Sequence, residues 1–414
     1  MYLFQFAMKN LRRHRRRTLI TAAAIAIGIA SFILIDSMLL GAEAESERNL
    51  IRYETASIRI HSSSWWQQRH ALPLSDLLEE PEALLATLRK AGYRATARTS
   101  VAAQLLTTAQ TFGIDGSLPL VITAIDASDS SVYQIIEGLD ADQLPGEYEL
   151  ILGAWFAEDI KARVGSRLTL ALRTDHQGEI EVPVTVSGLI DCPNPNVNRT
   201  LALMDRAFIN SILDLGTGAS SIDIALSSHR NLAKEQKRIA ELLASYPEEL
   251  TILSWEELAP DYLAISASKQ GGSALILFLV FIIAAVGISN TMLMAIYERT
   301  NEIGVLKALG ISEAELYRSF LYEAAGIGAL GSIVGLLTGA LANLYLVEVG
   351  INLSFMLRDL DIGYRIQESM YGAWELRTFL AAALGGIILS IVAALLPVRR
   401  VTKLSIVDAL RTGG

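Results

Sequence analysis

The sequence predicts an α-helical membrane protein with four transmembrane helices and one α+β extracytoplasmic domain. Two observations lead to this prediction. The chain has 414 residues, of which 51% are hydrophobic and only 19% are charged, whereas a soluble protein usually carries about 25% charged residues. The apolar residues are also concentrated in four long runs instead of being spread along the chain.

These four runs are long enough to cross a membrane. An α-helix needs about 20 residues to span roughly 30 Å of hydrocarbon, and its backbone polar groups are satisfied inside the helix itself. Asp36 is the only charged residue in any of the runs. The predicted transmembrane helices comprise residues 18–40, 271–297, 324–347 and 378–398.

Basic residues in the short segments that flank the predicted spans indicate the orientation, because Lys and Arg stay on the cytoplasmic side. Residues 1–17 and the tail 399–414 are both rich in Lys and Arg. We therefore expect a multi-pass protein of the cytoplasmic (inner) membrane with both termini and residues 298–323 in the cytoplasm. Residues 41–270 and 348–377 would then lie in the periplasm or extracytoplasmic space. Residues 1–17 also mix apolar and basic side chains, as in an amphipathic helix on the inner headgroup layer.

The extracytoplasmic domain, residues 41–270, shows a mixed pattern. Strand-like alternation and helix-like spacing follow one another near both ends, which predicts one split, porter-like α/β lobe made of residues 41–126 and 220–270. Short strands and turn-rich segments predict an inserted, mainly β lobe at residues 127–219. The expected helices are residues 75–91 and 231–245, and the expected strands are residues 56–61, 93–108, 119–125, 167–173, 181–189, 200–204, 221–226 and 251–253.

Composition and motifs argue against several function classes. The formal net charge of −9 disfavours nucleic-acid binding, because a phosphate-binding surface needs a basic field. One cysteine and five scattered histidines predict neither a disulfide nor a metal site. The sequence contains no HExxH or GxSxG pattern that would indicate a catalytic centre. We therefore expect a non-catalytic protein that binds no cofactor of its own.

Glycines in the predicted third span form a regular pattern. Gly331, Gly335 and Gly339 recur every fourth residue, which predicts a smooth helix face for close packing in lipid. A neighbouring span or a second copy of the chain would fill this face. The match of residues 326–331 to GxGxxG lies inside the span and follows no strand, so it does not indicate dinucleotide binding.

Three other residues are candidates for contact with a cargo. Asp36 is ionisable within a span, and such groups usually face protein or water. Trp65 and Trp66 stand between serines and glutamines, where they would contact a hydrophobic cargo, pack inside the domain or lie at the outer membrane interface. Packing or the interface is the favoured interpretation of the two tryptophans.

The most informative segment is residues 298–323, on the predicted cytoplasmic side. The helical pattern of the second span continues into this segment, so we expect one stiff rod that passes out of the membrane. Gly310 then ends the helix, and Ser312 with Glu315 forms a capping box for the next helix. A short helix close to the membrane face is suited to contact a soluble partner.

Residues 298–310, ERTNEIGVLKALG, resemble the signature ER-x-x-EIG-x-x-KA-x-G of the FtsX-like and MacB-type permeases of ABC transporters. Residues 7–12 and 395–411 resemble the start and the end of chains in this superfamily. Residues 149–153 and 164–170 resemble part of its extracytoplasmic domain. The resemblance covers essentially the whole chain, and the layout is most similar to that of the lipoprotein-releasing permeases LolC and LolE.

The resemblance implies a mechanism called mechanotransmission. A cytoplasmic ABC ATPase dimer would dock on the short helix, and its ATP-driven closure would move the extracytoplasmic domain. The sequence contains no GxxxxGK[ST] phosphate loop, so ATP and Mg would be bound by this partner. The residues implied in ATPase coupling are Glu298, Arg299, Glu302, Ile303, Gly304, Lys307, Ala308, Leu309 and Gly310.

The resemblance leaves the cargo and the partner permease open. The favoured hypothesis is extraction or export of a hydrophobic or lipidated cargo, such as a lipoprotein. In this hypothesis the chain pairs with a second permease copy or with a related permease chain. The alternatives are an FtsX-like regulator of an extracytoplasmic cell-wall hydrolase and a MacB-like efflux permease. The turn at residues 174–179 is shorter than the hairpin with which LolC-type permeases recruit a chaperone, so that recruitment is not predicted.

Overall fold

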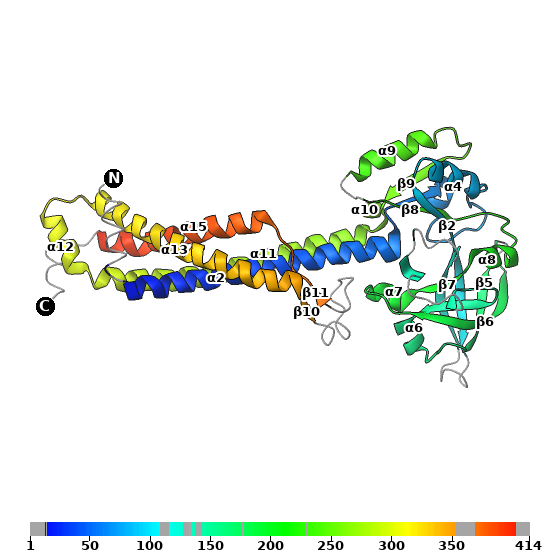
Figure 1. Ribbon diagram of the computed structural model, residues 1–414, viewed down its shortest axis with the longest axis horizontal. Helices are drawn as coiled ribbons and strands as arrows, with labels where there is room; N and C mark the ends of the chain where they lie inside the picture. The colour runs from blue at the N-terminus through cyan, green and yellow to red at the C-terminus, as the bar shows by residue number, and fades with distance from the viewer. Residues whose placement is uncertain are drawn as a thin grey trace. The chain divides into compact units, whose positions relative to one another are not determined.

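The computed structural model describes residues 13, 15–107, 116–126, 132, 134–136, 143–175, 178–227, 231–352 and 369–402 (Figure 1). They form two compact units. The helical unit takes its described residues from Met1–Glu43, Ser266–Asn352 and Ser369–Gly414, and the sheet unit takes them from Ala44–Ile265. The predicted amphipathic helix 1–17, loop 348–377 and tail 399–414 lie largely outside the described residues.

The described residues of the helical unit form long helices, one short helix and a two-stranded antiparallel pair. Side chains from each described helix of the unit meet in one apolar core, which includes Ile29, Ile288, Ile303, Phe320 and Ala394. The elements are α2 (Arg15–Leu50), α11 (Pro260–Tyr297), α12 (Thr300–Ala308), α13 (Glu313–Glu348), β10 (Ile351–Asn352), β11 (Ser369–Met370) and α15 (Leu376–Thr402) (Figure 1).

Three helical segments within the described residues are long and apolar enough to cross a membrane. They are Thr18–Thr55, Glu313–Glu348 and Leu376–Arg399. The predicted second span, residues 271–297, lies within the helix α11, but several of its side chains fall outside the described residues. The count of four crossings therefore stays a prediction.

Helices α2 and α11 extend beyond the predicted spans. Helix α2 continues to Leu50 instead of ending at Leu40, and α11 already begins at Pro260. A helix of 36 residues is about 54 Å long, well above the roughly 30 Å of the hydrocarbon core. Hydropathy marks only the apolar part of such a helix, because charged residues can continue the same helix in water. Both helices contribute residues to the helical unit and to the sheet unit.

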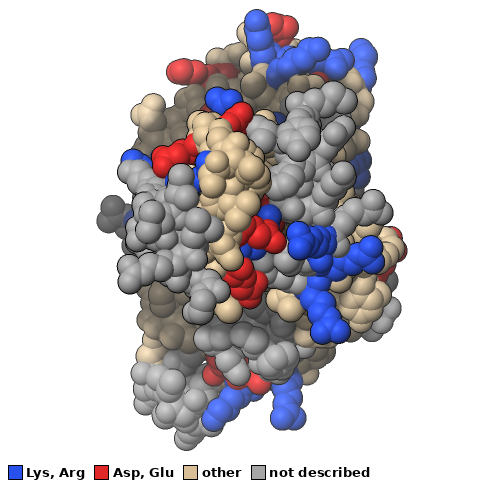
Figure 2. Space-filling model, turned by 90° about the vertical axis from the view of Figure 1, so that its left-hand side faces the viewer, with Lys and Arg blue, Asp and Glu red and all other residues tan. Residues whose placement is uncertain are grey.

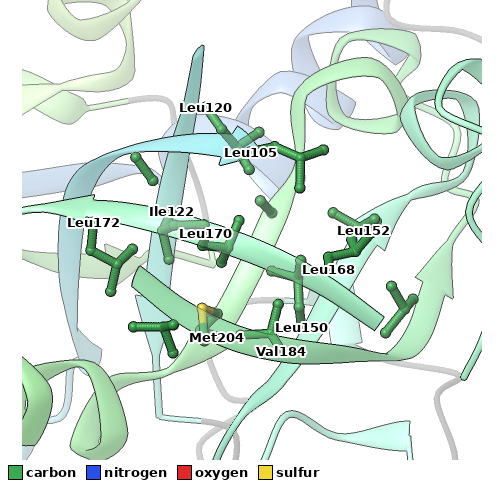
Figure 3. Packing of buried hydrophobic residues seen from close by; sticks show 14 of the residues in the cluster. Leu105, Leu120, Ile122, Leu150, Leu152, Leu168, Leu170, Leu172, Val184 and Met204 are labelled. Carbon is green, nitrogen blue, oxygen red and sulfur yellow. The ribbon is translucent and has the colours of Figure 1, made fainter. Parts of the chain in front are cut away.

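The sheet unit contains a nine-stranded sheet of which six strands close into a barrel. The ring runs β3–β7–β4–β6–β5–β2, and it closes because β2 pairs with β3 as well. Alternate residues of these strands point inward and form one core, in which Leu105, Ile122, Leu152, Leu170 and Met204 meet (Figure 3). The strands are β2 (Arg94–Thr107), β3 (Gly116–Ile125), β4 (Glu149–Gly153), β5 (Arg167–Arg173), β6 (Glu179–Ile190) and β7 (Ala202–Asp205).

A second lobe of the sheet unit extends the sheet beyond the barrel. The first half of β2 pairs with β8, and β1 lies between β8 and β9. Helices cover these strands and share a separate core with them, which includes Ile58, Leu84, Ile222 and Ile239. The elements are β1 (Ile58–Ser62), α4 (Pro81–Lys90), β8 (Ser221–Ala225), α9 (Leu232–Leu242), β9 (Leu250–Ser254) and α10 (Trp255–Leu258).

Strand β2 belongs to both lobes. Residues 94–98 pair with β8 in the α/β lobe, whereas residues 98–107 pair with β3 in the barrel. The barrel therefore includes strands that precede residue 127 in the chain.

The predicted helix 75–91 is wrong in its first part. Helix α4 begins only at Pro81, because proline is favoured in the first turn of a helix. Short helices that were not predicted are α3 (Ser63–Gln67), α6 (Ala154–Asp159), α7 (Pro195–Thr200) and α8 (Arg206–Ile212).

His61 on β1 makes the sheet unit sensitive to acid. Its Nδ1 donates to the carbonyl of Ser220 at 2.7 Å, and its ring stacks on Trp65 with centroids 4.5 Å apart. Burial, followed by the charge of Arg59, lowers the pKa of His61 from 6.5 to about 3. Between these pH values the unfolded chain binds a proton that the folded chain does not bind. The contribution of His61 to the free energy of unfolding is therefore fully present above pH 6.5. As the pH falls below this value, the contribution decreases by about 1.4 kcal/mol per pH unit.

We expect wild-type chain to lose about 2 kcal/mol of unfolding free energy through His61 between pH 7.5 and pH 5. His61→Gln keeps a donor for Ser220 but does not titrate, so its loss over this range should be smaller by that amount. Urea unfolding followed by tryptophan fluorescence measures the difference, because four of the five tryptophans lie in the sheet unit. An identical pH dependence in the two proteins would contradict this prediction.

Candidate docking site

The predicted continuous rod from the second span into residues 298–310 is wrong. Helix α11 ends at Tyr297, and α12 begins at Thr300 after a turn formed by Glu298 and Arg299. The hydroxyl of Thr300 donates to the carbonyl of Tyr297 at 2.8 Å, which stabilises the turn. The break separates α12 from α11 as an element of its own.

The other end of α12 has the predicted form. Gly310 follows the helix with φ +92°, a conformation that glycine adopts without strain. Ser312 then caps α13, because its side chain accepts from the backbone N–H of Glu315 and the Glu315 carboxylate accepts from the Ser312 N–H at 3.0 Å. The predicted helix end and capping box are confirmed. They fix the turn between α12 and α13.

A buried ion pair anchors α12 to α13. Arg299 is 6% exposed and Glu323 is 3% exposed, and Nη1 of Arg299 lies 3.2 Å from Oε2 of Glu323. Nε of the same guanidinium donates to Glu302 at 3.0 Å, and the guanidinium lies over the ring of Phe320. One side chain in the turn therefore binds α12 and α13 together. Glu323 was not predicted as a site residue, although an acid at the start of an apolar span is an unusual feature.

The predicted coupling residues divide into a buried and an exposed set. Ile303 and Gly304 are buried in the core of the helical unit together with Arg299, so they hold α12 in place and are not accessible to a partner. Leu309 is 76% exposed and Val305 is 48% exposed. The remaining exposed or half-buried members of the predicted set are Glu298, Glu302, Lys307, Ala308 and Gly310.

We call the exposed face of α12 formed by Val305, Ala308 and Leu309 the α12 ridge. Charged groups border it. Glu302 forms an ion pair with Arg13 at 3.5 Å, and Nζ of Lys307 lies 3.0 Å from the carboxylate of Glu313. Figure 2, which views this end of the molecule, shows side chains of both charges around uncharged ones. An apolar ridge with a charged rim has the composition of a protein-binding surface.

The glycine face of α13 packs against α2. A Cβ atom on Gly331 would lie 2.7 Å from Cβ of Ile25, and one on Gly335 would lie 2.9 Å from the carbonyl oxygen of Ala26. Gly339 meets Ile33 in the same way. Of the two predicted occupants of this face, the structure places the neighbouring span there. The absence of side chains lets the two helices approach closely.

Two protein families match the chain. The MacB-like periplasmic core domain matches residues 18–242, more than half of the 414 residues, and the FtsX-like permease C-terminal domain matches residues 274–406. The chain belongs to the MacB- and FtsX-like ABC transporter permeases. This permease is accordingly a membrane protein whose sheet unit is a MacB-like periplasmic domain of mixed α/β structure.

Relatives of the permease include transporters of two kinds. It is 23% identical over 421 residues to the lipoprotein-releasing system transmembrane protein LolC of Neisseria meningitidis, covering 95% of this chain and 94% of LolC. It is 22% identical to the macrolide export ATP-binding/permease protein MacB of Pasteurella multocida, covering 82% of this chain and 52% of MacB. The crystal structure of the periplasmic region of MacB from Actinobacillus actinomycetemcomitans aligns with 52% of this chain and 97% of that chain, at 16% identity and a TM-score of 0.34.

Asp36 of the permease takes part in a polar cluster of the helical unit. It accepts a hydrogen bond from the hydroxyl of Thr378 on α15. One residue further on, Ser37 bonds the buried Asn343 of α13 and donates to the carbonyl of Ala373 at 2.9 Å. The cluster joins α2, α13 and the segment before α15. These contacts give Asp36 a packing function in the helical unit, and its contact with a cargo stays a prediction.

The paired tryptophans of the permease lie on α3 in the sheet unit. Trp65 is 5% exposed, and its Nε1 donates to the carbonyl of Pro73 at 3.1 Å. The proposed cargo contact of Trp65 does not agree with this burial, since the ring is already covered by the protein. Trp66 is half-buried, with the guanidinium of Arg69 at 4.5 Å from its ring. Within the described residues, no group of three or more His, Cys, Asp or Glu is arranged to hold a metal ion.

Proposed function

We propose that this permease is the non-catalytic membrane subunit of an ABC transporter that works by mechanotransmission. A separate cytoplasmic ATPase dimer binds ATP and Mg²⁺ and docks on the α12 ridge. Both termini and α12 lie in the cytoplasm, and the sheet unit lies on the other side of the cytoplasmic membrane. Closure of the ATPase displaces α12, and the long helices α2 and α11 transmit the displacement to the sheet unit.

The observation that carries this proposal is the α12 ridge. Leu309 and Val305 stand exposed on a helix of only nine residues, yet the buried pair of Arg299 and Glu323 fixes this helix to α13. An exposed apolar surface of this kind indicates a binding partner. A partner that pushes on α12 would move α13 through the ion pair and α11 through the turn. The match of residues 274–406 to the FtsX-like permease domain supports the same assignment.

The proposed cargo is hydrophobic or lipidated, such as a lipoprotein taken from the outer leaflet. This proposal is supported by the similarity to LolC, which covers nearly the full length of both chains. A second copy of the permease, or a related chain, completes the transporter. The similarity to MacB supports macrolide-type efflux as a second candidate. A lipoprotein that co-purifies with the complex would favour the first function.

Leu309→Asp together with Val305→Asp should abolish association with the ATPase. A carboxylate in place of each aliphatic side chain adds a charge that the interface would have to desolvate, and each such loss at an interface centre costs about 2 kcal/mol or more. The measurement is affinity purification of the tagged chain from its native membranes, followed by mass spectrometry for an ABC ATPase and an ATP hydrolysis assay.

Val164→Asp is the matched control, because Val164 is an exposed aliphatic residue of the sheet unit. The control should retain the ATPase and its hydrolysis rate. Retention of the ATPase by the α12 double variant at the wild-type level would contradict the docking function. Wild-type chain that purifies without any ABC ATPase would contradict the transporter assignment as a whole.

A further inference from the structure

The end of α2 in the sheet unit is an unusual piece of backbone. Residues Ile51–Thr55 form the π-helix η1 directly after α2. π-Helical turns are rare in proteins, and those that occur are often at functional sites. Ala56 follows with φ 58° and ψ −178°, in a region that residues other than glycine rarely adopt. Strained backbone of this kind persists only where the surrounding structure holds it in place.

η1 is wedged between the two lobes of the sheet unit. Ile51 is buried in the core of the α/β lobe together with Ile58 and Ile222. Tyr53 packs against a different apolar cluster, which contains Ile125, Ile135, Ile136, Ile151, Ile190, Cys192, Val197 and Leu203 and draws on barrel strands. The π-helix that directly continues the first long helix therefore contacts both lobes.

The carboxylate of Glu54 binds the barrel lobe. Nδ2 of Asn194 donates to Oε1 at 2.7 Å, and Nδ2 of Asn196 donates to Oε2 at 3.0 Å. Asn194 also donates from Nδ2 to the carbonyl of Asn49 on α2, at 3.5 Å. Each carboxylate oxygen thus has an amide donor from the segment that follows β6. Hydrogen bonds to an ionised acceptor are stronger than those between neutral groups.

The segment that holds Glu54 is itself rigid. Oδ1 of Asn194 accepts from the backbone N–H groups of Asn196 and Val197, which caps α7. Asn198 is fully buried, and its Oδ1 accepts from the N–H of Cys192 at 2.9 Å. Helix α7 also lies so close to β4 that a Cβ atom on Gly153 would be 2.4 Å from the carbonyl oxygen of Asn198. The segment that holds Glu54 is therefore fixed to the barrel.

The backbone of Glu54 binds the other lobe. Its carbonyl accepts from Nη2 of Arg59 at 3.1 Å and from Nη1 of Arg98 at 3.5 Å. Arg59 in turn donates from Nη2 to Asp223 at 3.0 Å, and Asp223 on β8 is completely buried. A buried ion pair with these hydrogen bonds resists separation. Glu54 is thus bound by its side chain to the barrel lobe, and by its backbone to Arg59 of the α/β lobe and to Arg98, which lies on the part of β2 that both lobes share.

A cavity beside η1 leaves room for movement. It has a volume of about 760 Å³, and its lining includes Tyr53, Glu54, Thr123, Asn196 and Arg199. Close-packed interiors resist displacement of their side chains, whereas an element that borders a cavity of this size has space to shift.

We propose that η1 is the joint that fastens α2 to both lobes of the sheet unit, and that Glu54 is the positioning residue that couples displacement of α2 to the barrel. This inference rests on the proposed function, because it needs an ATPase that displaces α2. It adds the point at which the displacement enters the barrel. Without the Glu54 carboxylate, α2 still moves, but the barrel segment at residues 192–201 no longer follows.

Hydrogen exchange with mass spectrometry tests this proposal on the full chain with its ATPase in nanodiscs, with and without ATP and vanadate. In the wild-type complex, trapping the ATPase with ATP and vanadate should change hydrogen exchange both at residues 44–56 and at residues 192–201. In Glu54→Ala the response at residues 44–56 should remain, and the response at residues 192–201 should be lost. Glu54→Gln keeps one acceptor oxygen and should restore part of the response. A purely structural function of Glu54 would change basal exchange without separating the two responses.

Glu181→Ala is the matched control, because Glu181 is an exposed carboxylate on strand β6 of the same barrel. It should show the wild-type pattern. A response at residues 192–201 that survives in Glu54→Ala would overturn the joint while leaving the transporter assignment intact. Absence of any response at residues 44–56 in wild-type complex that retains its ATPase would overturn transmission through α2, and with it the joint.

Discussion

Arg299→Ala should lower the free energy of unfolding of the helical unit by about 3–5 kcal/mol and abolish ATPase docking. Removal of the guanidinium takes the ion pair at 3.2 Å from the buried carboxylate of Glu323. It also removes the bond to Glu302 and the contact with the ring of Phe320. The turn at Arg299 joins α11 to α12, and the Arg299 side chain binds α13. Loss of this side chain therefore frees α12 from its position.

Two further variants separate the ion pair from a general effect of substitution. Arg299→Met combined with Glu323→Leu replaces both charges by apolar groups, and such replacements are often neutral for stability. Lys307→Ala removes a pair whose acidic partner, Glu313, is mostly exposed, so the expected loss is below about 1 kcal/mol. Thermal unfolding of the detergent-solubilised wild-type chain, Arg299→Ala, the double variant and Lys307→Ala gives the four stabilities. Equal stability of Arg299→Ala and Lys307→Ala would contradict the anchor.

Gly335→Leu should prevent the close packing of α2 on α13. Even a Cβ atom at this position would lie 2.8 Å from Cβ of Ile29 and 2.9 Å from the carbonyl oxygen of Ala26. A backbone oxygen cannot move out of the way, so the helices must separate along the face that Gly331 and Gly339 share. Overpacking of this kind costs about 3 kcal/mol or more, and we expect most of the chain to be lost from the monodisperse fraction after solubilisation.

Gly287→Leu is the control for the glycine variant. Gly287 lies within a predicted span, on α11, and a Cβ atom there would meet nothing within 4 Å. The same substitution should therefore leave yield and thermal stability near the wild-type values. Size-exclusion chromatography with thermal unfolding gives both quantities. A Gly335→Leu chain as monodisperse and as stable as Gly287→Leu would show that the glycine face does not determine the packing.

Local signals predicted the end of α12 correctly. Gly310 and the capping box of Ser312 with Glu315 act within a few residues, so their effect can be inferred from spacing. The break at Glu298 and Arg299 could not be inferred in this way. It depends on a partner carboxylate in another helix, Glu323, which is 24 residues further along the chain. The same pairing explains why Arg299, Ile303 and Gly304 are buried although they belong to the signature.

Long-range pairing also limited the prediction of the sheet unit. Strand β2 was predicted as one strand nearly over its observed length, but its sequence does not show that one half joins β8 and the other half closes the barrel with β3. The contact of Glu54 with Asn194 joins residues 140 positions apart. The extension of α2 to Leu50 was missed because charged residues from Glu43 onward end the apolar run. None of these features has a local signature.

A crosslinking experiment at Leu309 tests the central claim most directly, namely that an ATPase grips the α12 ridge. Leu309→Cys is labelled with a photoactivatable maleimide, while the native Cys192 is buried and its pKa is raised to about 11, which disfavours its reaction. Val164→Cys in the sheet unit is labelled in parallel. The account predicts a covalent adduct between position 309 and an ABC ATPase, and none from position 164. An ATPase adduct at position 164 but not at position 309 would contradict it.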